Sequence, residues 1–353
     1  MKYLISGGGT GGHIFPAVSI ANALRELDNE AQILFVGALG RMEMERVPQA
    51  GYEIIGLPVR GFNRAQPWKN ISVLWDLMKS MRTARKIIKD FKPDVAVGVG
   101  GYASGAAMKV AAKMGIPVVL QEQNGFAGVT NKLLKDDAAK ICVAYEGMER
   151  FFPKDKIILT GNPVRQNLTD GKRTVAQGTT NLLVIGGSLG ARTINNALAT
   201  HIEELKEAGI HVVWQTGKGY IKQYRSLADE KAGIRVTDFL SDMPTEYANA
   251  DLVISRAGAS SISELCLLGK AAILVPSPNV AEDHQTHNAM ALVNKDAAVM
   301  IRDNEAVEKL VPTAIELLSQ PDRLQTLSTN ILELAQRDSA KRIAEEVIAL
   351  VRH

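Results

Sequence analysis

The sequence predicts an α/β protein with two domains, each built on a parallel β-sheet, and three observations support this class. The chain has 353 residues, and at roughly 150 residues per domain this is enough for two separate cores. Short runs of Val, Ile and Leu alternate with helical patterns throughout, as is typical of parallel β-α units. Each half also opens with an apolar strand, a glycine-rich turn and a helix, at 2–17 and 181–197. We therefore expect two Rossmann-like domains that face each other across a cleft.

Each expected strand is a short aliphatic or β-branched run bounded by polar residues or glycine. Seven such runs occur in the first half, at 2–7, 32–37, 52–57, 95–100, 117–123, 140–144 and 156–161. Six occur in the second half, at 181–186, 211–216, 234–239, 251–255, 271–276 and 298–301. Residues 161–165 and the polar stretch 167–180 lie between the two sets, and we interpret them as the linker between the domains.

Composition and charge exclude several classes of protein. The chain is 46% hydrophobic with a formal charge of +3, which excludes a disordered protein. Its two cysteines, Cys142 and Cys266, lie in separate halves, so a disulfide framework and a zinc knuckle are excluded and a reducing cytosol is expected. No run of 18 apolar residues and no signal peptide occurs, so we expect a soluble or peripheral protein.

The first glycine-rich turn, GGGTGG at 7–12, is expected to bind a phosphate or a sugar. It matches GxGxxG, but the next strand ends in FVGAL, without the carboxylate that holds the ribose of a nicotinamide cofactor. His13 stands where a Walker A loop has lysine. What remains is backbone that approaches a ligand at a helix start, where the dipole also favours a neutral, basic imidazole. The structural alternatives are a tight turn and a packed histidine.

The second turn, GGSLG at 186–190, contains the G-x-S-x-G pattern of a hydrolase nucleophile. A serine hydrolase that uses Ser188 with His211, His284 or His287 is therefore an alternative function. The spacing of His284 and His287 also suits a metal, but no carboxylate or cysteine set completes the site, so no metal is expected.

Residues 256–264, RAGASSISE, follow an expected strand and have two interpretations. In the structural one, Ser261 and Glu264 form a capping box at a helix start, and Gly269 caps the helix end. In the functional one, the serine-rich helix start binds a diphosphate while Glu264 accepts hydrogen bonds from ribose hydroxyls.

A basic segment at 61–92 contains eight basic and two acidic residues, a local charge of +6. On a helix the segment forms an apolar stripe of Ile71, Leu74, Met78, Met81 and Ile88. Beside this stripe lie the basic residues Lys79, Arg82, Lys86 and Lys89, and near the start lie Trp68 and Trp75. The pattern fits a core-facing helix with a solvated edge, or an anionic membrane surface at about 1 kcal/mol per basic residue. Nucleic acid is not expected, because the excess charge is confined to one segment without a recognition motif.

In their order along the chain, these motifs resemble one family. The chain is closely similar to the MurG family of N-acetylglucosaminyltransferases, which convert lipid I to lipid II in bacterial peptidoglycan synthesis, in six motifs: GGTGGHIFPA at 8–17, GGY at 100–102, EQNG at 122–125, GNPVR at 161–165, GGS at 186–188 and RAGA at 256–259. One departure is Gln121, because the family usually has histidine before this Glu-Gln-Asn. An essential imidazole is therefore not expected at that position.

The resemblance implies a GT-B fold: an N-terminal acceptor and membrane-associated domain at 1–163, a UDP-GlcNAc-binding domain at 164–338 and a helix at 339–353 that packs back on the first domain. It implies inverting transfer of GlcNAc from UDP-GlcNAc to the 4-hydroxyl of lipid I. The implied partners are UDP-GlcNAc, lipid I and an anionic membrane surface, with the protein peripheral at the cytoplasmic face of the bacterial membrane. Neither a cofactor nor a metal is implied. A nucleotide-sugar binding protein without turnover is a third hypothesis.

The resemblance also assigns site residues. Donor contacts fall on Thr10, Gly11, Gly12, Asn124, Arg165, Ser188, Leu240, Ala259, Ser260, Ser261, Ile262, Ser263, Glu264 and Gln285. Uracil is expected to pair with backbone near Leu240. His13 is expected to assist at the acceptor hydroxyl, as the base or by orienting it, while Glu122 and Tyr102 at the same sheet edge are the alternatives.

Overall fold

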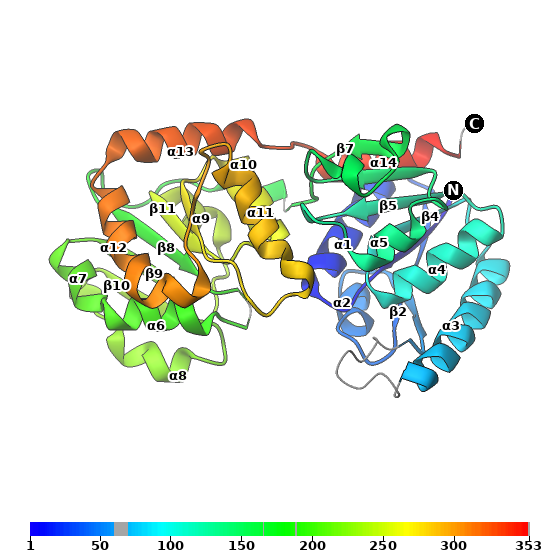
Figure 1. The fold of residues 1–353 in the computed structure, drawn as a ribbon, viewed down its shortest axis with the longest axis horizontal. Helices are drawn as coiled ribbons and strands as arrows, with labels where there is room; N and C mark the ends of the chain where they lie inside the picture. The colour runs from blue at the N-terminus through cyan, green and yellow to red at the C-terminus, as the bar shows by residue number, and fades with distance from the viewer. Residues whose placement is uncertain (60–69, 165, 188, 352–353) are drawn as a thin grey trace. The chain divides into compact units, whose positions relative to one another are not determined.

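The computed structural model describes residues 1–59, 70–164, 166–187 and 189–351. The chain divides into two compact units, each with its own sheet and covering helices (Figure 1). The first unit comprises Met1–Val164 and Asp338–His353, and the second unit comprises Arg165–Arg337.

The first unit contains a parallel sheet of seven strands in the order β3-β2-β1-β4-β5-β6-β7. The strands are β1 Lys2–Gly7, β2 Gln32–Ala38, β3 Glu53–Leu57, β4 Val95–Gly100, β5 Val118–Glu122, β6 Lys140–Val143 and β7 Ile157–Leu159. The helices of this unit are α1 Gly11–Leu27, α2 Glu43–Gln49, α3 Asn70–Phe91, α4 Tyr102–Lys113, α5 Val129–Leu134 and α14 Ser339–Ala349.

The second unit contains a parallel sheet of six strands in the order β10-β9-β8-β11-β12-β13. The strands are β8 Asn181–Ile185, β9 His211–Gln215, β10 Ile234–Thr237, β11 Leu252–Ser255, β12 Ala272–Leu274 and β13 Val299–Met300. The α-helices are α6 Arg192–Thr200, α7 Ile202–Glu207, α8 Ile221–Tyr224, α9 Met243–Asn249, α10 Ala259–Leu268, α11 His284–Val293, α12 Ala306–Leu318 and α13 Pro321–Glu333. All thirteen expected strands are present, with bounds within two residues of those expected, and the predicted α/β class is confirmed.

The central strands are buried on both faces, which explains their near-continuous apolar sequences. Tyr3 and Ile5 of β1 pack on one face with residues of α1 and α14, and Leu4 packs on the other with residues of α3 and α4. In the second unit, Leu182 and Val184 of β8 pack with residues of α6 and α12. A sheet covered in this way leaves only its strand ends and their loops for ligands.

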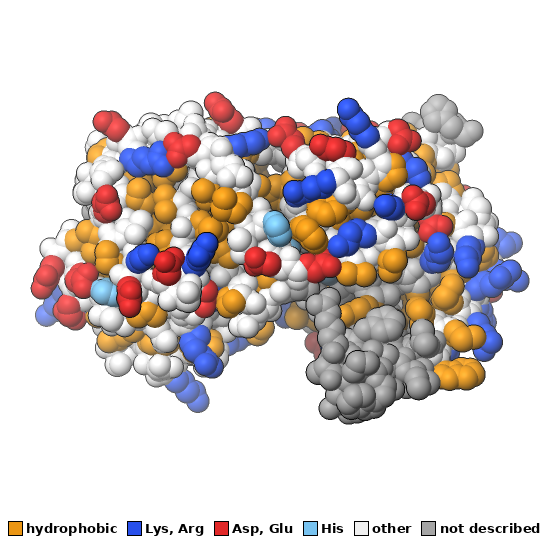
Figure 2. Space-filling model, viewed as in Figure 1, with side chains coloured by type: hydrophobic (Ala, Val, Ile, Leu, Met, Phe, Trp, Pro, Cys, Tyr) orange, Lys and Arg blue, Asp and Glu red, His pale blue; other side chains and the backbone are white. Residues whose placement is uncertain are grey.

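Helix α3 directs its basic residues outward. Met81 and Ile88 pack into the core as the stripe predicts, but Met78 is 48% exposed and shares an outer face with Trp75, which is 67% exposed. Met78 therefore does not fit the core-facing interpretation of the stripe, because Ala84 and Ile87 complete the buried face instead. Figure 2 shows Lys and Arg side chains gathered over α3. Trp68 and the side chains of Ile71 and Leu74 lie outside the described residues.

None of the helices in the described ranges is both long and apolar enough to cross a bilayer.

The last helix, α14, belongs to the first unit and lies against α1. Ile343 and Val347 are fully buried in the cluster that also contains residues of α1. Arg342 Nη2 donates to the Leu159 carbonyl at 2.6 Å, and Lys140 pairs with Glu346, so β6 and β7 are tied to this helix as well.

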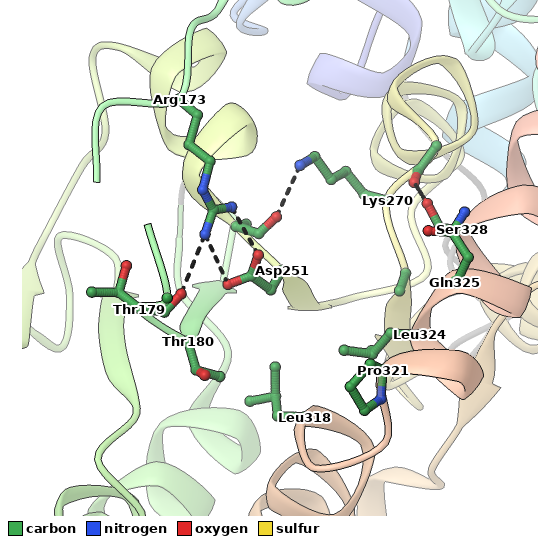
Figure 3. A pocket seen from close by; sticks show the side chains of 14 residues that line it. Arg173, Thr179, Thr180, Asp251, Lys270, Leu318, Pro321, Leu324, Gln325 and Ser328 are labelled. Carbon is green, nitrogen blue, oxygen red and sulfur yellow. Dashed lines mark hydrogen bonds and ion pairs between the residues drawn. The ribbon is translucent and has the colours of Figure 1, made fainter. Parts of the chain in front are cut away.

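The polar stretch 167–180 is not a linker, which corrects the sequence interpretation. It belongs to the second unit, where Arg173 pairs with Asp251 at 2.8 Å (Figure 3). Arg173 also donates to the Asn249 carbonyl at 3.1 Å. The backbone N–H of Thr174 donates to Asn249 Oδ1 at 2.7 Å. Its polar residues therefore fix the segment to the amino end of β11.

Candidate active site

In both units the candidate residues lie where strands end. The strand order reverses between β1 and β4, which end side by side at Gly7 and Gly100, and between β8 and β11, which end side by side at Ile185 and Ser255. Ligands of open parallel sheets bind at such reversals. The first unit brings Thr10, Gly11, Gly12, His13, Tyr102, Glu122 and Asn124 to this edge, and the second brings Leu240, Ala259, Ser260, Ser261, Ile262, Ser263, Glu264 and Gln285 to its own. Arg165 and Ser188 lie outside the described residues.

The loops after β1 and β4 touch through their backbones. The Gly8 N–H donates to the Gly100 carbonyl at 3.3 Å. A Cβ on Gly101, whose φ is +93°, would lie 2.5 Å from the Gly8 carbonyl oxygen. Only glycine permits this approach, so the glycines form the edge itself and leave Thr10 and Gly12 exposed at the start of α1.

His13 is oriented by this loop. Its Nδ1 lies 3.1 Å from the Gly8 carbonyl oxygen and 3.3 Å from Thr10 Oγ1. Because a carbonyl can only accept, the proton of the neutral ring is placed on Nδ1 and the lone pair on Nε2. The ring lies along Gly100, where a Cβ would come within 2.8 Å of Nε2. The geometry suits a ring whose Nε2 accepts a proton.

Glu122 is 2% exposed and organises the loop that follows β5. Its Oε1 accepts from the backbone and side-chain N–H groups of Asn124 at 3.1 and 3.3 Å. Its Oε2 accepts from the Gly128 N–H at 3.0 Å and from Asn131 Nδ2 at 2.9 Å. With both oxygens engaged, this carboxylate is better placed to hold Asn124 than to take a proton. Tyr102 begins α4 with its side chain 54% exposed.

Gln121 lies in a buried amide network rather than at the surface of the site. Its Nε2 donates to Asn162 Oδ1 at 3.0 Å, and Asn162 Nδ2 donates to the Gln123 carbonyl at 2.9 Å. Gln123 Nε2 donates in turn to the Val99 carbonyl at 2.7 Å. An amide can both donate and accept, so the network joins the ends of β4 and β5 without charge.

Glu43, at the start of α2, is a site residue that sequence reasoning missed. Its side chain is fully buried under the first glycine loop. Its Oε2 accepts from the Gly9 N–H at 2.9 Å and its Oε1 from the Ala38 N–H at 3.0 Å. A Cβ on Gly8 would lie 2.2 Å from Oε1. No local pattern distinguishes Glu43 from the exposed Glu45, so only the fold identifies it.

Gln215 is the corresponding missed residue in the second unit. It is buried at the end of β9, and its Oε1 accepts from the Gly186 N–H at 3.1 Å. Its Nε2 donates to the carbonyls of Gly187 at 2.8 Å and Asp238 at 3.1 Å. The amide thereby fixes the loop after β8 to the loop after β10.

Helix α10 begins earlier than the capping box requires. Gly258 is its N-cap, without a side-chain cap, so the proposed box between Ser261 and Glu264 is wrong. The Ile262 N–H reaches the Gly258 carbonyl at 3.0 Å, which leaves the N–H groups ahead of it at the positive helix end, where an anion binds well. Glu264 Oε2 instead accepts from Tyr247 Oη at 2.9 Å. Gly269 caps the helix end with φ 60°, as predicted.

Leu240 and Gln285 complete the second edge. Leu240 is buried, and its backbone N–H and carbonyl make no hydrogen bond with other described residues. Gln285 Oε1 accepts from the Ser277 N–H at 2.9 Å, so its amide oxygen is engaged within the protein.

His211, one of the three candidate histidines of the hydrolase alternative, lies away from the GGSLG turn. His211 begins β9 and pairs in register with Asn181, the first residue of β8, so it lies at the opposite end of the strand from the GGSLG turn. Within the described ranges, no group of three or more His, Cys, Asp and Glu side chains is placed to hold a metal ion.

The pocket drawn in Figure 3 lies at the other edge of the second sheet. It has a volume of about 440 Å³ and is lined by residues that precede strands, among them Thr180, Asp251 and Ala271. Its charged groups bind within the protein: Arg173 pairs with Asp251, and Lys270 Nζ donates to the Ala250 carbonyl at 2.8 Å. Burial lowers the pKa of Lys270. The pocket is therefore not the site at the carboxyl ends of the strands.

Comparisons with known proteins agree with the geometry. The glycosyltransferase family 28 N-terminal domain matches residues 3–143, and the family 28 C-terminal domain matches residues 181–346. A Phocaeicola vulgatus protein named UDP-N-acetylglucosamine–N-acetylmuramyl-(pentapeptide) pyrophosphoryl-undecaprenol N-acetylglucosamine transferase is 60% identical, over 99% of this chain and 96% of its own. A Bacteroides fragilis protein of the same name is 58% identical, over 99% and 96%. These transferase names give the hydrolase alternative no support.

Solved structures show the same architecture. Acinetobacter baumannii MurG superimposes with a TM-score of 0.83 at 27% identity, over 99% of both chains. The calicheamicin glycosyltransferase CalG4 superimposes with a TM-score of 0.69 at 15% identity, over 100% of this chain and 98% of its own, which shows the fold alone. Both family domains are thus matched in order along a GT-B fold, and the chain belongs to glycosyltransferase family 28 and, within it, to the MurG family that its motifs resemble.

Proposed function

We propose that this chain transfers GlcNAc from UDP-GlcNAc to the 4-hydroxyl of MurNAc-pentapeptide carried on undecaprenyl diphosphate. The observation that carries the proposal is the 60% identity, over nearly the whole chain, to a transferase named for this donor and acceptor. The arrangement of the two sheet edges supports it, because one presents an oriented imidazole and the other an anion-binding helix start.

The second unit is the proposed donor site. The diphosphate binds at the α10 start around Ser260, and Glu264 accepts hydrogen bonds from the ribose diol. Uracil pairs with the backbone of Leu240, and the amide of Gln285 donates to a sugar hydroxyl. Arg165 and Ser188 are proposed as further donor contacts.

The first unit is the proposed acceptor site, with His13 as the base. Nε2 takes the proton of the 4-hydroxyl as its oxygen attacks the anomeric carbon and the bond from that carbon to the UDP oxygen breaks. The attack from the opposite side inverts the anomeric centre through an oxocarbenium-like state. The helix start at α10 stabilises the negative charge that develops on the leaving diphosphate. Glu122 holds Asn124 in place for the sugar.

The outer face of α3 is the proposed membrane contact. It combines two exposed apolar residues, Trp75 and Met78, with the exposed basic residues Lys79, Arg82, Lys86 and Lys89. An anionic lipid surface attracts such charges while the apolar side chains insert. The protein is accordingly proposed to act as a peripheral protein at the cytoplasmic face of the bacterial membrane, where its lipid-linked acceptor is embedded.

One assay tests the transfer. Labelled UDP-GlcNAc and a lipid I analogue should yield a lipid-linked disaccharide and UDP. Tight UDP-GlcNAc binding without any disaccharide would instead support a nucleotide-sugar binding protein. The Ser188→Ala variant separates the hydrolase, because loss of a donor contact weakens donor binding, whereas loss of a nucleophile abolishes turnover at unchanged affinity.

A second assay tests the membrane contact. Replacing Lys79, Arg82 and Lys86 with Glu should reduce binding to vesicles that contain anionic lipid, while turnover of a short-chain soluble acceptor stays near the wild-type rate. The matched control replaces three exposed lysines of the second unit, Lys172, Lys222 and Lys231, by Glu. Equal vesicle binding by both variants would contradict a specific role for α3.

A further inference from the structure

We propose that Glu43 is a positioning residue for His13 and acts through the peptide group that joins Gly8 to Gly9. The inference rests on the proposed function, in which His13 is the base. It adds a buried carboxylate, from an element outside the glycine loop, to the machinery of proton transfer.

One peptide group connects the two side chains. Its N–H belongs to Gly9 and donates to Glu43 Oε2 at 2.9 Å, while its carbonyl belongs to Gly8 and lies 3.1 Å from His13 Nδ1. The carboxylate, the peptide and the imidazole therefore form a continuous chain of hydrogen bonds. The proton on Nδ1 points toward Gly8, so Nε2 is directed away from this series of hydrogen bonds.

The electrostatics of these hydrogen-bonded groups favour a protonated His13 ring during the reaction. Glu43 is fully buried, and its charge is screened little by solvent. A carboxylate that accepts from a peptide N–H polarises that peptide and makes its carbonyl a stronger acceptor. The Gly8 carbonyl then stabilises the imidazolium that forms when Nε2 takes the acceptor proton. The logic is that of a carboxylate behind a catalytic histidine, with one peptide group inserted between them.

The surrounding glycines make room for this carboxylate. A Cβ on Gly8 would lie 2.2 Å from Glu43 Oε1, and a Cβ on Gly37 would lie 2.6 Å from Glu43 Cγ. Gly9 has a φ of +88°, which favours glycine. The second hydrogen bond, from the Ala38 N–H to Oε1 at 3.0 Å, fixes the other oxygen, so the carboxylate cannot rotate away from Gly9 without losing a partner.

A double-mutant cycle tests the proposal. Glu43→Gln should lower kcat about tenfold or more while the KM for UDP-GlcNAc changes little; loss of the partner that orients a metal-ligating histidine, a comparable arrangement, typically costs about 10- to 100-fold. In a His13→Ala background the same substitution should cost almost nothing, since the group on which Glu43 acts is gone. Glu45→Gln is the matched control, because Glu45 is exposed on the same helix. A wild-type kcat for Glu43→Gln, or an equal loss in both backgrounds, would overturn the inference.

A measurement on the unmodified protein covers the case in which Glu43→Gln does not fold. Nitrogen-15 NMR of labelled histidine should show neutral His13 protonated at Nδ1, with a strongly hydrogen-bonded proton. A ring protonated at Nε2 would overturn the inference. The resonance does not depend on turnover, so a chain that fails to form disaccharide would refute the proposed function, while this experiment still tests the His13 tautomer that the inference requires.

Discussion

Each of the two glycine loops is held by hydrogen bonds to one buried side chain, and the two side chains differ. Glu43 accepts two backbone N–H bonds under the first loop, whereas Gln215 accepts one N–H bond and donates to two carbonyls under the second. Both side chains are buried, so the contrast is one of charge: a carboxylate in the first unit and a neutral amide in the second.

The difference follows the charge that each loop has to face. A negative charge beneath His13 favours the cation that this ring would become in the proposed proton transfer. Beneath the loop after β8, which contains the proposed donor contact Ser188, a negative charge would repel an anionic donor, while an amide holds the backbone without doing so. Under the proposed function, the same local architecture would therefore serve proton transfer in one unit and donor binding in the other.

The largest effect is expected when the neutral amide of Gln215 is replaced by a carboxylate like that of Glu43. Gln215→Glu should lower the free energy of unfolding by about 3 kcal/mol or more, because it buries a charge and loses the two hydrogen bonds that Nε2 donates. UDP affinity should fall as well. Denaturant unfolding and calorimetry check both results, with Gln325→Glu at an exposed position as control. Wild-type values for Gln215→Glu would show that the neutrality of this support does not matter.

The proposed role of the first loop in proton transfer is tested by replacing His13. His13→Ala should lower kcat about 10²-fold, or about 2.7 kcal/mol, the usual range for a lost general base, with little change in UDP affinity. His201→Ala, at a histidine far along the chain in the second unit, is the control. A variant that keeps its kcat would transfer the role to Glu122, Tyr102 or a water molecule, and one that loses donor binding would place His13 in the phosphate loop.

The proposed donor site of the second unit is tested at the ribose. Glu264→Gln should weaken UDP binding by about 2 kcal/mol, or roughly 30-fold, which is typical of a hydrogen bond to a charged group. Tyr247→Phe removes only the hydroxyl that donates to Glu264 at 2.9 Å, so its effect should be smaller. Calorimetric titration with UDP compares the two. Unchanged affinity for Glu264→Gln would leave this residue with a structural role only.

The smallest effect concerns a second, contrasting histidine. Glu204 accepts from His201 Nδ1 at 2.7 Å and raises the pKa of His201, whereas His13 faces a neutral carbonyl. The folded pKa lies above the unfolded one, so this pair stabilises the protein below about pH 6.5 and the contribution is lost as the pH rises through the folded pKa. The loss should be under about 1 kcal/mol. Denaturant unfolding from pH 5 to 9 should show it in the wild type, and Glu204→Gln should remove it.

The strands and their loops could be predicted because their signals are local. Runs such as β1 are buried on both faces, so their sequence is largely apolar, and glycines mark the turns that follow. Glu43 and Gln215 could not be predicted, because Glu43 bonds to a backbone group 34 residues earlier and Gln215 to one 29 residues earlier. A side chain that serves distant backbone leaves no periodic pattern in the sequence.

Two predictions from the sequence are wrong for the same physical reason. The capping box at Ser261 fits its residues, but Gly258 can begin the helix three residues earlier in an extended conformation, and backbone geometry decides between them. The stretch 167–180 has the polar composition of a linker, yet Arg173 and its neighbours use their polar groups to bind the sheet edge. Composition records which groups are polar and does not record their partners.

The position of α14 has a consequence for the order in which the protein matures. Residues 338–353 complete the first unit, so the whole second unit lies in the sequence between the two segments of the first. During synthesis the apolar side chains of α1 that α14 covers stay uncovered until the last helix leaves the ribosome. The second unit has all of its own strands by then, so we expect it to fold first, although it is translated later. A chain that stops before α14 would present an open core rather than a shortened enzyme.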